Sequence, residues 1–139
     1  MVEPSLLYSV KQVELAVRAH LDEVVRHAGL TTSTYTALTV LQRRTGLTAA
    51  ELARNSFVTP QATADIVTAL ERRALISRHA DPDHGRRRLI SLTENGRAVL
   101  ADLAPAVSAL EERMLAALDA DARAELRRSL NACRSALAG

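Results

Sequence analysis

The apolar positions near the start of the chain repeat at alternating steps of three and four residues. This stripe consists of Leu6, Val10, Val13, Val17, Leu21, Val24 and Ala28, and Gly29 follows it directly. Such spacing places the apolar side chains on one face of a helix, and a glycine just beyond is a common helix end. The pattern predicts one long amphipathic helix, whose apolar face is longer than the core of a 139-residue monomer needs.

Three shorter helices are predicted between residues 31 and 74. The first opens at Thr31-Thr32-Ser33 and carries Tyr35, Leu38 and Leu41 on one face. The second opens at Thr48-Ala49-Ala50-Glu51, a capping box in which each end residue bonds the backbone of the other. A turn at 55–58 separates it from the third, which Thr59 caps and Pro60 begins.

The third of these helices is predicted to have one apolar and one polar face. The residues assigned to the core are Ala62, Ile66, Ala69 and Leu70. The residues assigned to solvent are Gln61, Thr63, Asp65, Thr68 and Arg72. The exposed face therefore consists mainly of small polar side chains.

A hairpin and two more helices are predicted in the second half of the chain. Residues 75–79 and 87–92 are predicted strands, joined by a polar turn at 81–86. Thr93 caps a long helix with an apolar stripe at Val99, Leu103, Val107, Leu110, Met114 and Leu118, and Pro105 predicts a kink in it. A last helix begins after Asp119 or Asp121 and carries Leu126, Leu130, Cys133 and Leu137 on one face.

Composition narrows the class of protein. No run of 18 apolar residues exists, so we expect a soluble cytoplasmic protein without a membrane segment. A single cysteine provides neither an internal disulfide nor a cysteine-rich metal site. The chain has no glycine-rich phosphate loop, no nucleophile elbow and no metalloprotease motif, so we predict a protein that is not an enzyme and needs no cofactor.

Positive charge is concentrated in the middle of the chain. Between Arg43 and Arg97 there are ten arginines and six acidic residues, a local balance of +4, whereas the segments before and after each sum to −1. This distribution is typical of a polyanion-binding centre with flanks that serve another purpose, although a solvated basic face would look the same in sequence.

The order of elements, mainly α-helical with a small β-hairpin, predicts a winged helix-turn-helix. A short helix, a tight turn and a second helix suit binding in the major groove of DNA, and the hairpin that follows would be the wing. The alternative is an α+β fold with no such role, or a winged-helix module that binds protein rather than DNA. Steep loss of affinity with salt would distinguish the DNA-binding protein.

Three stretches of the chain resemble the MarR family of bacterial transcriptional regulators. They are Gly46-Leu47-Thr48-Ala49-Ala50-Glu51-Leu52-Ala53, the helix from Thr59 into Leu70-Glu71-Arg72-Arg73-Ala74-Leu75-Ile76, and Asp81-Pro82-Asp83-His84-Gly85-Arg86-Arg87-Arg88-Leu89 leading into Leu92-Thr93-Glu94-Asn95-Gly96. The resemblance implies a homodimeric repressor, bound to a pseudo-palindromic operator and released by a small phenolic or lipophilic compound.

This sequence departs from the family pattern at three positions. His84 stands where an aspartate that supports the wing arginine is common, and Ala74 stands where glycine is usual. Asp65 stands where many members carry a basic residue that faces DNA. An acid there repels phosphate but can accept a hydrogen bond from cytosine N4.

Candidate DNA-binding residues lie on the third short helix, at its start and on the wing. They are Ser56, Thr59, Gln61, Thr63, Thr68, Arg86 and Arg88. Gln61 and Thr63 are the predicted base readers, and Ser56 and Thr59 are predicted at the helix start or against phosphate. Arg86 is predicted at the wing tip in or beside the minor groove, with Arg88 on phosphate and Arg87 on the opposite side of the strand.

The terminal stripes are predicted to form a dimer interface. The residues assigned to it are Leu6, Val10, Val13, Val17, Leu126, Leu130 and Leu137. The corresponding division of the chain is a dimerisation helix at 1–30, a DNA-binding domain at 31–97 and dimerisation helices at 98–139. A two-fold dimer would present two recognition helices about one DNA turn apart.

The sequence gives only weak indications of residues that could sense a ligand, a metal or an oxidant. Tyr8, His20 and Tyr35 are candidate ligand-binding residues because each is a polar-tipped ring near the expected crevice. His20, Glu23 and His27 share a helical face, but without a fourth ligand a solvated face is favoured over a metal site. Cys133 is predicted to be a buried core thiol rather than a redox sensor.

Overall fold

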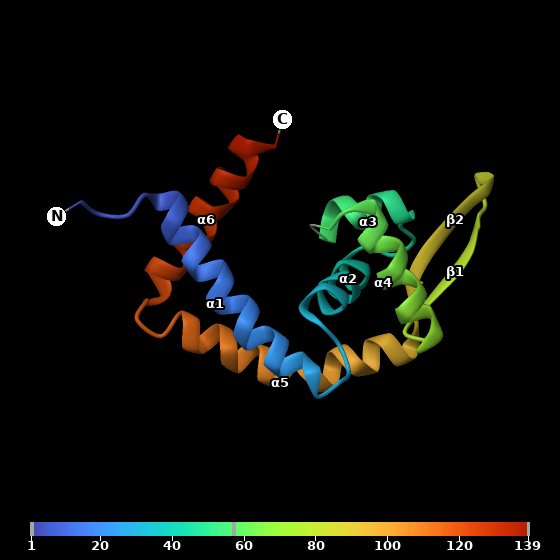
Figure 1. The fold of residues 1–139 in the computed structure, drawn as a ribbon, viewed down its shortest axis with the longest axis horizontal. Helices are drawn as coiled ribbons and strands as arrows, with labels where there is room; N and C mark the ends of the chain where they lie inside the picture. The colour runs from blue at the N-terminus through green and yellow to red at the C-terminus, as the bar shows by residue number, and fades with distance from the viewer. Residues whose placement is uncertain (1, 57, 139) are drawn as a thin grey trace. The chain divides into compact units, whose positions relative to one another are not determined.

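The structure is a computed structural model that describes residues 2–56 and 58–138. Within them the chain forms six helices and one two-stranded antiparallel hairpin (Figure 1). In chain order they are α1 (Leu6–Arg26), α2 (Thr32–Arg43), α3 (Ala49–Ser56), α4 (Pro60–Arg72), β1 (Ile76–Asp81), β2 (His84–Leu92), α5 (Glu94–Met114) and α6 (Ala120–Leu137). The predicted element order and the winged-helix fold class are confirmed.

The elements divide into two compact units, Met1–Pro105 and Ala106–Gly139. The core of the first unit is aliphatic, and its most buried members are Val25, Leu38, Leu41, Leu52, Leu70 and Ile90. They come from α1, α2, α3, α4 and β2, so a single apolar cluster holds the helix-turn-helix against the hairpin. The division differs from the one expected from sequence, because α1 belongs to the same unit as the predicted DNA-binding domain.

Polar contacts fasten the end of α1 to α2 and to α4. The Asp22 carboxylate accepts hydrogen bonds from the Thr32 hydroxyl at 2.5 Å and from the Thr32 N–H at 2.8 Å, and these bonds lower the pKa of Asp22. The Arg73 guanidinium, just after α4, donates to the carbonyl oxygens of Ala28 at 2.7 Å and Gly29 at 3.0 Å. The segment between α1 and α2 is therefore bonded both to α1, through Asp22, and to the end of α4, through Arg73.

The hairpin carries an irregularity near its tip. The pairing is regular from Ile76 opposite Leu92 to Ala80 opposite Arg88, and then Asp81 pairs with His84. Three residues of β2, at 85–87, are therefore unmatched on β1, which is a bulge. The predicted second strand began at Arg87, whereas β2 begins at His84, because a bulge of this kind has no alternating apolar pattern to reveal it.

Helix α4 ends in a left-handed residue that is not glycine. The N–H of Leu75 donates to the Leu70 carbonyl at 3.0 Å and the N–H of Ala74 donates to the Glu71 carbonyl at 2.9 Å. These two bonds form a Schellman motif, in which glycine is the usual left-handed residue. Ala74 has φ of +58°, so its Cβ is strained against its own backbone, as its departure from the family pattern suggested.

Replacing Ala74 with glycine should raise the free energy of unfolding by about 1 kcal/mol, because the strain is removed and this exposed Cβ contributes little burial. Thermal unfolding followed by circular dichroism would show a midpoint higher by a few degrees. The matched control is Ala98→Gly, an exposed helical position of α5 with no such strain, where the midpoint should fall. A lower midpoint for Ala74→Gly would contradict the strain.

The start of α5 is crowded against the end of the preceding segment. The Thr93 hydroxyl donates to the Ala74 carbonyl at 2.6 Å and accepts from the Gly96 N–H at 3.1 Å, so Thr93 caps α5 as predicted. A Cβ on Gly96 would lie 2.3 Å from the backbone oxygen of Leu75 and 2.6 Å from Cδ1 of Leu92. Only glycine fits at this position.

Helix α5 continues through Pro105, and the two compact units divide at this residue. In the second unit the Arg123 guanidinium binds both Glu112 carboxylate oxygens, at 2.9 and 3.0 Å, and the carbonyls of Leu115 and Leu118. Asp119, one of the two predicted starts, caps α6. Across the described ranges, no helix combines the length and apolarity required to cross a bilayer.

Candidate nucleic-acid interface

Helix α4 exposes a continuous stripe of mainly polar residues. Thr59 caps the helix by accepting from the Ala62 N–H at 3.1 Å, and Pro60 is its first residue. Thr63, Val67 and Leu70 face the core. The exposed stripe, spaced at three and four residues, is Gln61, Ala64, Asp65, Thr68 and Arg72.

The prediction that Thr63 reads bases is wrong. Its side chain is only 1% exposed, and its hydroxyl donates to the Thr59 carbonyl at 2.9 Å. Ala69, which was assigned to the core, is exposed instead. The apolar side of α4 is thus rotated from the predicted one, because threonine can face a core when its hydroxyl bonds the preceding turn of its own helix.

The prediction of a phosphate contact for Ser56 is also contradicted. Ser56 is the last residue of α3 and is 4% exposed. Its hydroxyl is buried without a hydrogen-bond partner among the described residues. Asn55 also lies within α3, so the predicted turn at 55–58 is shorter than expected, and Phe57 lies outside the described residues.

Replacing Ser56 with alanine should therefore raise the free energy of unfolding by about 1 kcal/mol, because it removes an unpaired buried hydroxyl. Affinity for DNA should stay within about twofold, a change of less than about 0.5 kcal/mol. The comparison variant is Thr59→Ala, which deletes the α4 cap and should lower the stability by about 1 kcal/mol. A large loss of DNA affinity in Ser56→Ala would restore the phosphate role.

The other predicted residues of this region are exposed. Thr59 and Gln61 lie at the first turn of α4, and Thr68 lies two turns further along. The Thr68 hydroxyl donates to the Ala64 carbonyl at 3.0 Å. Because its hydrogen is used within the helix, this hydroxyl presents only acceptor capacity to an outside partner.

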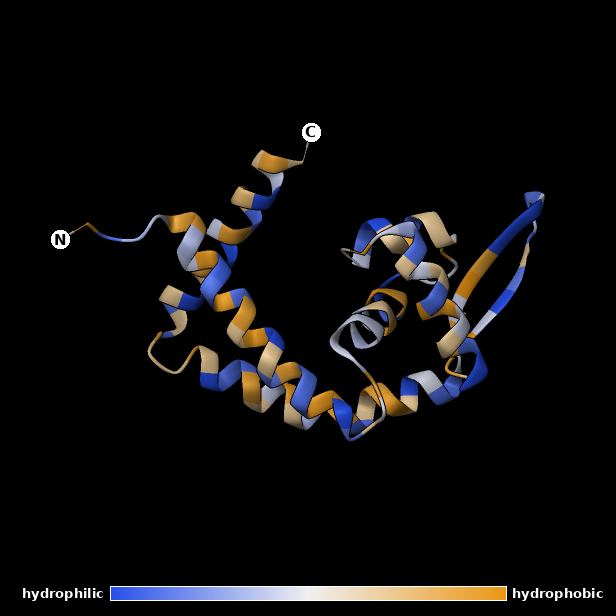
Figure 2. Cartoon of the chain, in the orientation of Figure 1, coloured by the Kyte–Doolittle hydropathy of each residue, from blue (hydrophilic) through white to orange (hydrophobic). Residues whose placement is uncertain are grey.

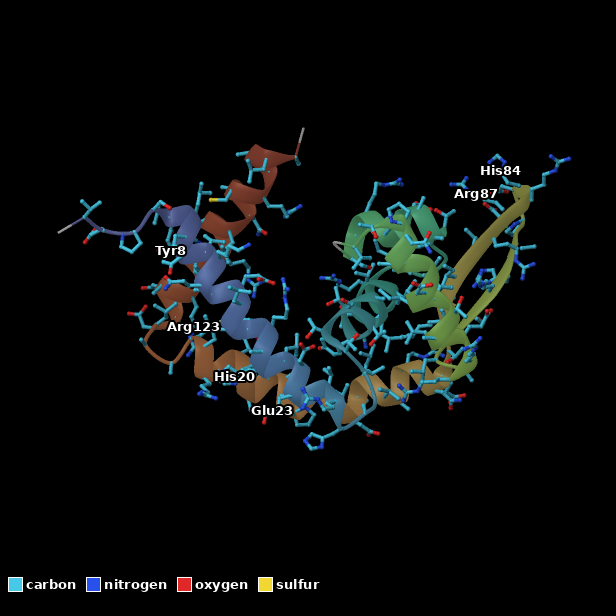
Figure 3. All side chains as sticks on the ribbon, viewed as in Figure 1. Tyr8, His20, Glu23, His84, Arg87 and Arg123 are labelled. Carbon is cyan, nitrogen blue, oxygen red and sulfur yellow. The ribbon has the colours of Figure 1, made fainter. Side chains whose placement is uncertain are left out.

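The hairpin tip presents three consecutive exposed arginines, Arg86, Arg87 and Arg88. Figure 3 shows Arg87 and His84 at the outer end of the hairpin. Arg87 lies 3.9 Å from the Glu51 carboxylate of α3. Hydrogen bonds from the Thr48 backbone and hydroxyl, and then the charge of Arg87, hold the pKa of Glu51 below its ordinary value.

A cavity of about 310 Å³ lies between α1 and the start of α2. Its lining includes Arg18, Asp22 and Arg26, one turn apart on α1, and residues 30–33. Of its charged lining residues, Arg18 is paired with the Glu14 carboxylate one turn earlier on α1, and Asp22 accepts the two hydrogen bonds from Thr32. Sequence reasoning missed it because the two arginines resemble ordinary solvated residues until α2 is placed beside them.

The three predicted ligand-binding residues do not line this cavity. Tyr8 and His20 are separated by 12 residues of α1, which corresponds to about 18 Å along a helix (Figure 3). Burial raises the pKa of Tyr35, which lies in α2. The structure therefore does not bring Tyr8 and His20 into one small site within the chain.

The sequence leaves a sensing role open for His20, Glu23 and His27 on α1 and for Cys133 on α6. Among residues 2–56 and 58–138, no three His, Cys, Asp or Glu side chains are grouped so that they could hold a metal ion. Cys133 is exposed, so the prediction of a buried thiol is wrong for the single chain. The reason is that α6 has no buried residue in this chain.

The predicted dimer stripes are largely uncovered. On α1, Leu6 is 83% exposed and Val10 and Val13 are more than half exposed, while Val17 is half-buried. On α6, Leu137 is 85% exposed, Leu130 is exposed and Leu126 is half-buried. Figure 2 shows hydrophobic residues along both helices. Exposure of this many large apolar side chains is unusual for an isolated chain.

Comparisons with known proteins give relatives along almost the whole chain. The MarR family model matches residues 28–87. The HTH-type transcriptional repressor Rv2887 of Mycobacterium tuberculosis is 33% identical over 123 residues, covering 88% of each chain.

Solved structures agree with the fold. The crystal structure of the Mycobacterium tuberculosis MarR family protein Rv2887 in complex with salicylic acid aligns with a TM-score of 0.76 and 32% identity, over 94% of this chain and 97% of that one. The Staphylococcus aureus MepR–DNA complex aligns with a TM-score of 0.83 over 97% and 100%, and at 21% identity it shows the fold alone. By its family match and its relatives, the chain belongs to the MarR family of transcriptional regulators.

Proposed function

We propose that the protein is a transcriptional repressor that binds a pseudo-palindromic duplex operator as a homodimer, with α4 in the major groove and the β1–β2 hairpin beside it. The carrying observation is that α4, which exposes a polar stripe, packs against strand β1 of the hairpin whose tip carries three exposed arginines. The similarity to the repressor Rv2887 supports this assignment. Duplex DNA as the ligand implies a cytoplasmic protein.

Selection of duplexes from a random pool tests this function. An enriched inverted repeat is expected, and its affinity measured by fluorescence anisotropy should exceed that of a scrambled duplex. Affinity should fall steeply with salt, because each neutralised phosphate contributes about −0.9 to the slope of log K against log salt. Weak, salt-insensitive binding to all duplexes would favour a module that binds protein.

The homodimer is proposed from the uncovered apolar side chains of α1 and α6. Truncation of the chain before Leu126 removes most of α6 and should give monomeric or aggregated protein. Sedimentation velocity of the truncated and full chains at equal concentration measures the difference. A well-behaved dimer of the truncated chain would contradict the assignment of α6 to the interface.

A small aromatic or lipophilic effector is proposed for the same regulator. The cavity beside α1 is lined by Arg18 and Arg26 and has a volume of about 310 Å³, room for a small aromatic acid, and Rv2887 was crystallised with salicylic acid. Salicylate should weaken operator binding, whereas neutral salicylamide should have little effect. The double variant Arg18→Ala/Arg26→Ala should lose the salicylate response but still bind operator, and an unchanged response would exclude this cavity.

A further inference from the structure

The centre of the exposed α4 stripe presents hydrogen-bond acceptors and no cation. Asp65 is exposed, and no ion pair of its carboxylate is found in the described part of the chain. Its neighbour Thr68 has already donated its hydroxyl hydrogen to the Ala64 carbonyl. An ionised carboxylate and a hydroxyl in this state can only accept hydrogen bonds from DNA.

Basic side chains lie outside this central region. The first arginine of α4 is Arg72, one turn beyond Thr68. The common contact of arginine with guanine therefore cannot come from the middle of the helix. Arg72 and the hairpin arginines are available to attract phosphate, and the centre of the stripe is available for selecting bases.

Base chemistry restricts what Asp65 can face. In the major groove guanine offers two acceptors, and thymine offers one acceptor and a methyl group, so both repel or fail to bond a carboxylate. Amino donors are found on cytosine N4 and adenine N6. Adenine places the N7 acceptor beside its amino group, and cytosine has no such neighbouring acceptor on the same base, so cytosine fits a carboxylate better.

We propose that Asp65 is a specificity-determining residue that selects a cytosine in each operator half-site by accepting a hydrogen bond from its N4 amino group. This inference rests on the proposed DNA-binding function. Asp65 should lower the affinity for DNA in general, because its carboxylate repels the phosphates. In return it should increase the discrimination between cytosine and the other bases.

Duplex selection with the full chain and two variants tests the inference. The wild type should enrich one invariant cytosine per half-site, and replacing that cytosine by guanine should weaken its binding about tenfold or more. Asp65→Ala should reduce this discrimination to about twofold or less while binding scrambled DNA more tightly. Asp65→Asn should shift the preference to adenine, because an amide pairs with adenine N6 and N7.

Glu71→Gln is the matched control. It removes one negative charge from the same helix, at a side chain that pairs with Arg78 at 3.3 Å and lies outside the stripe. It should alter affinity for all duplexes alike and leave the preferred sequence unchanged.

The duplex selection distinguishes a failure of the proposed DNA-binding function from a failure of the proposed role of Asp65. If the wild type enriches no inverted repeat, the proposed DNA-binding function itself fails, and the role of Asp65 with it. If an inverted repeat is enriched, but Asp65→Ala and Asp65→Asn select the same bases as the wild type, the function stands and the role of Asp65 is overturned.

Discussion

Replacing Arg86 with alanine should weaken operator binding by about thirty- to a hundredfold while leaving the fold and oligomeric state intact. Each hairpin would lose a contact worth about 1 kcal/mol or slightly more, and a dimer bound to a two-fold operator loses the contact twice. Arg86 is exposed in the unmatched segment of β2 and makes no hydrogen bond or ion pair among the described residues, so its removal leaves no buried group without a partner. Fluorescence anisotropy on the selected operator provides the measurement.

The control for Arg86 is Arg134→Ala on α6. It removes the same charge from an exposed position outside the helix-turn-helix unit. Sedimentation must show that both variants assemble as the unmodified protein does. The salt slope of Arg86→Ala should also become shallower. Equal affinity for Arg86→Ala and the unmodified protein would exclude the hairpin tip from the interface.

Replacing Gly96 with alanine should lower the free energy of unfolding by roughly 2–3 kcal/mol, the largest stability effect expected in the first unit. The added Cβ overlaps the backbone oxygen of Leu75, which cannot rotate away as a flexible side chain can. Leu75 itself is fixed, because its carbonyl accepts from the Thr93 N–H at 3.1 Å. The junction of α4, the hairpin and α5 must therefore open.

Gly85→Ala is the matched control for Gly96. No atom lies within 4 Å of a Cβ built on Gly85, so this variant should change the stability by less than about 0.5 kcal/mol. Chemical denaturation of both variants, followed by circular dichroism, gives the two free energies. A Gly96→Ala variant as stable as Gly85→Ala would show that the junction relaxes without cost.

Local chemistry explains why the order of elements could be predicted from sequence. Thr59, Thr93 and Asp119 each bond the backbone N–H three residues along, and such caps depend only on neighbouring residues. The end of the first helix is also signalled locally, because Gly29 has φ of +74°, a conformation that glycine adopts without strain. The helix ends can therefore be predicted without knowing which distant segments of the chain pack together.

The errors at the site have causes that the hydrophobic pattern of the sequence does not contain. Thr63 faces the core because its hydroxyl is satisfied inside α4, which a hydrophobic pattern does not register. The cavity beside Arg18 and Arg26 requires α2 to be placed against α1. Cys133 follows the apolar pattern of α6, yet a single chain provides nothing to bury that helix. Pattern alone identifies apolar faces but not what covers them.

The contacts of Arg73 with Ala28 and Gly29 join the end of α4 to the chain segment beside the cavity. The carbonyls that Arg73 holds stand immediately before residues 30–33, which form one wall of the cavity. A molecule that displaces this wall also changes the free energy of the bonds at the end of α4, and the reverse is equally true. If an effector binds in the cavity, its occupancy and the position of α4 should be coupled in both directions, and Arg73 is one of the groups that join them.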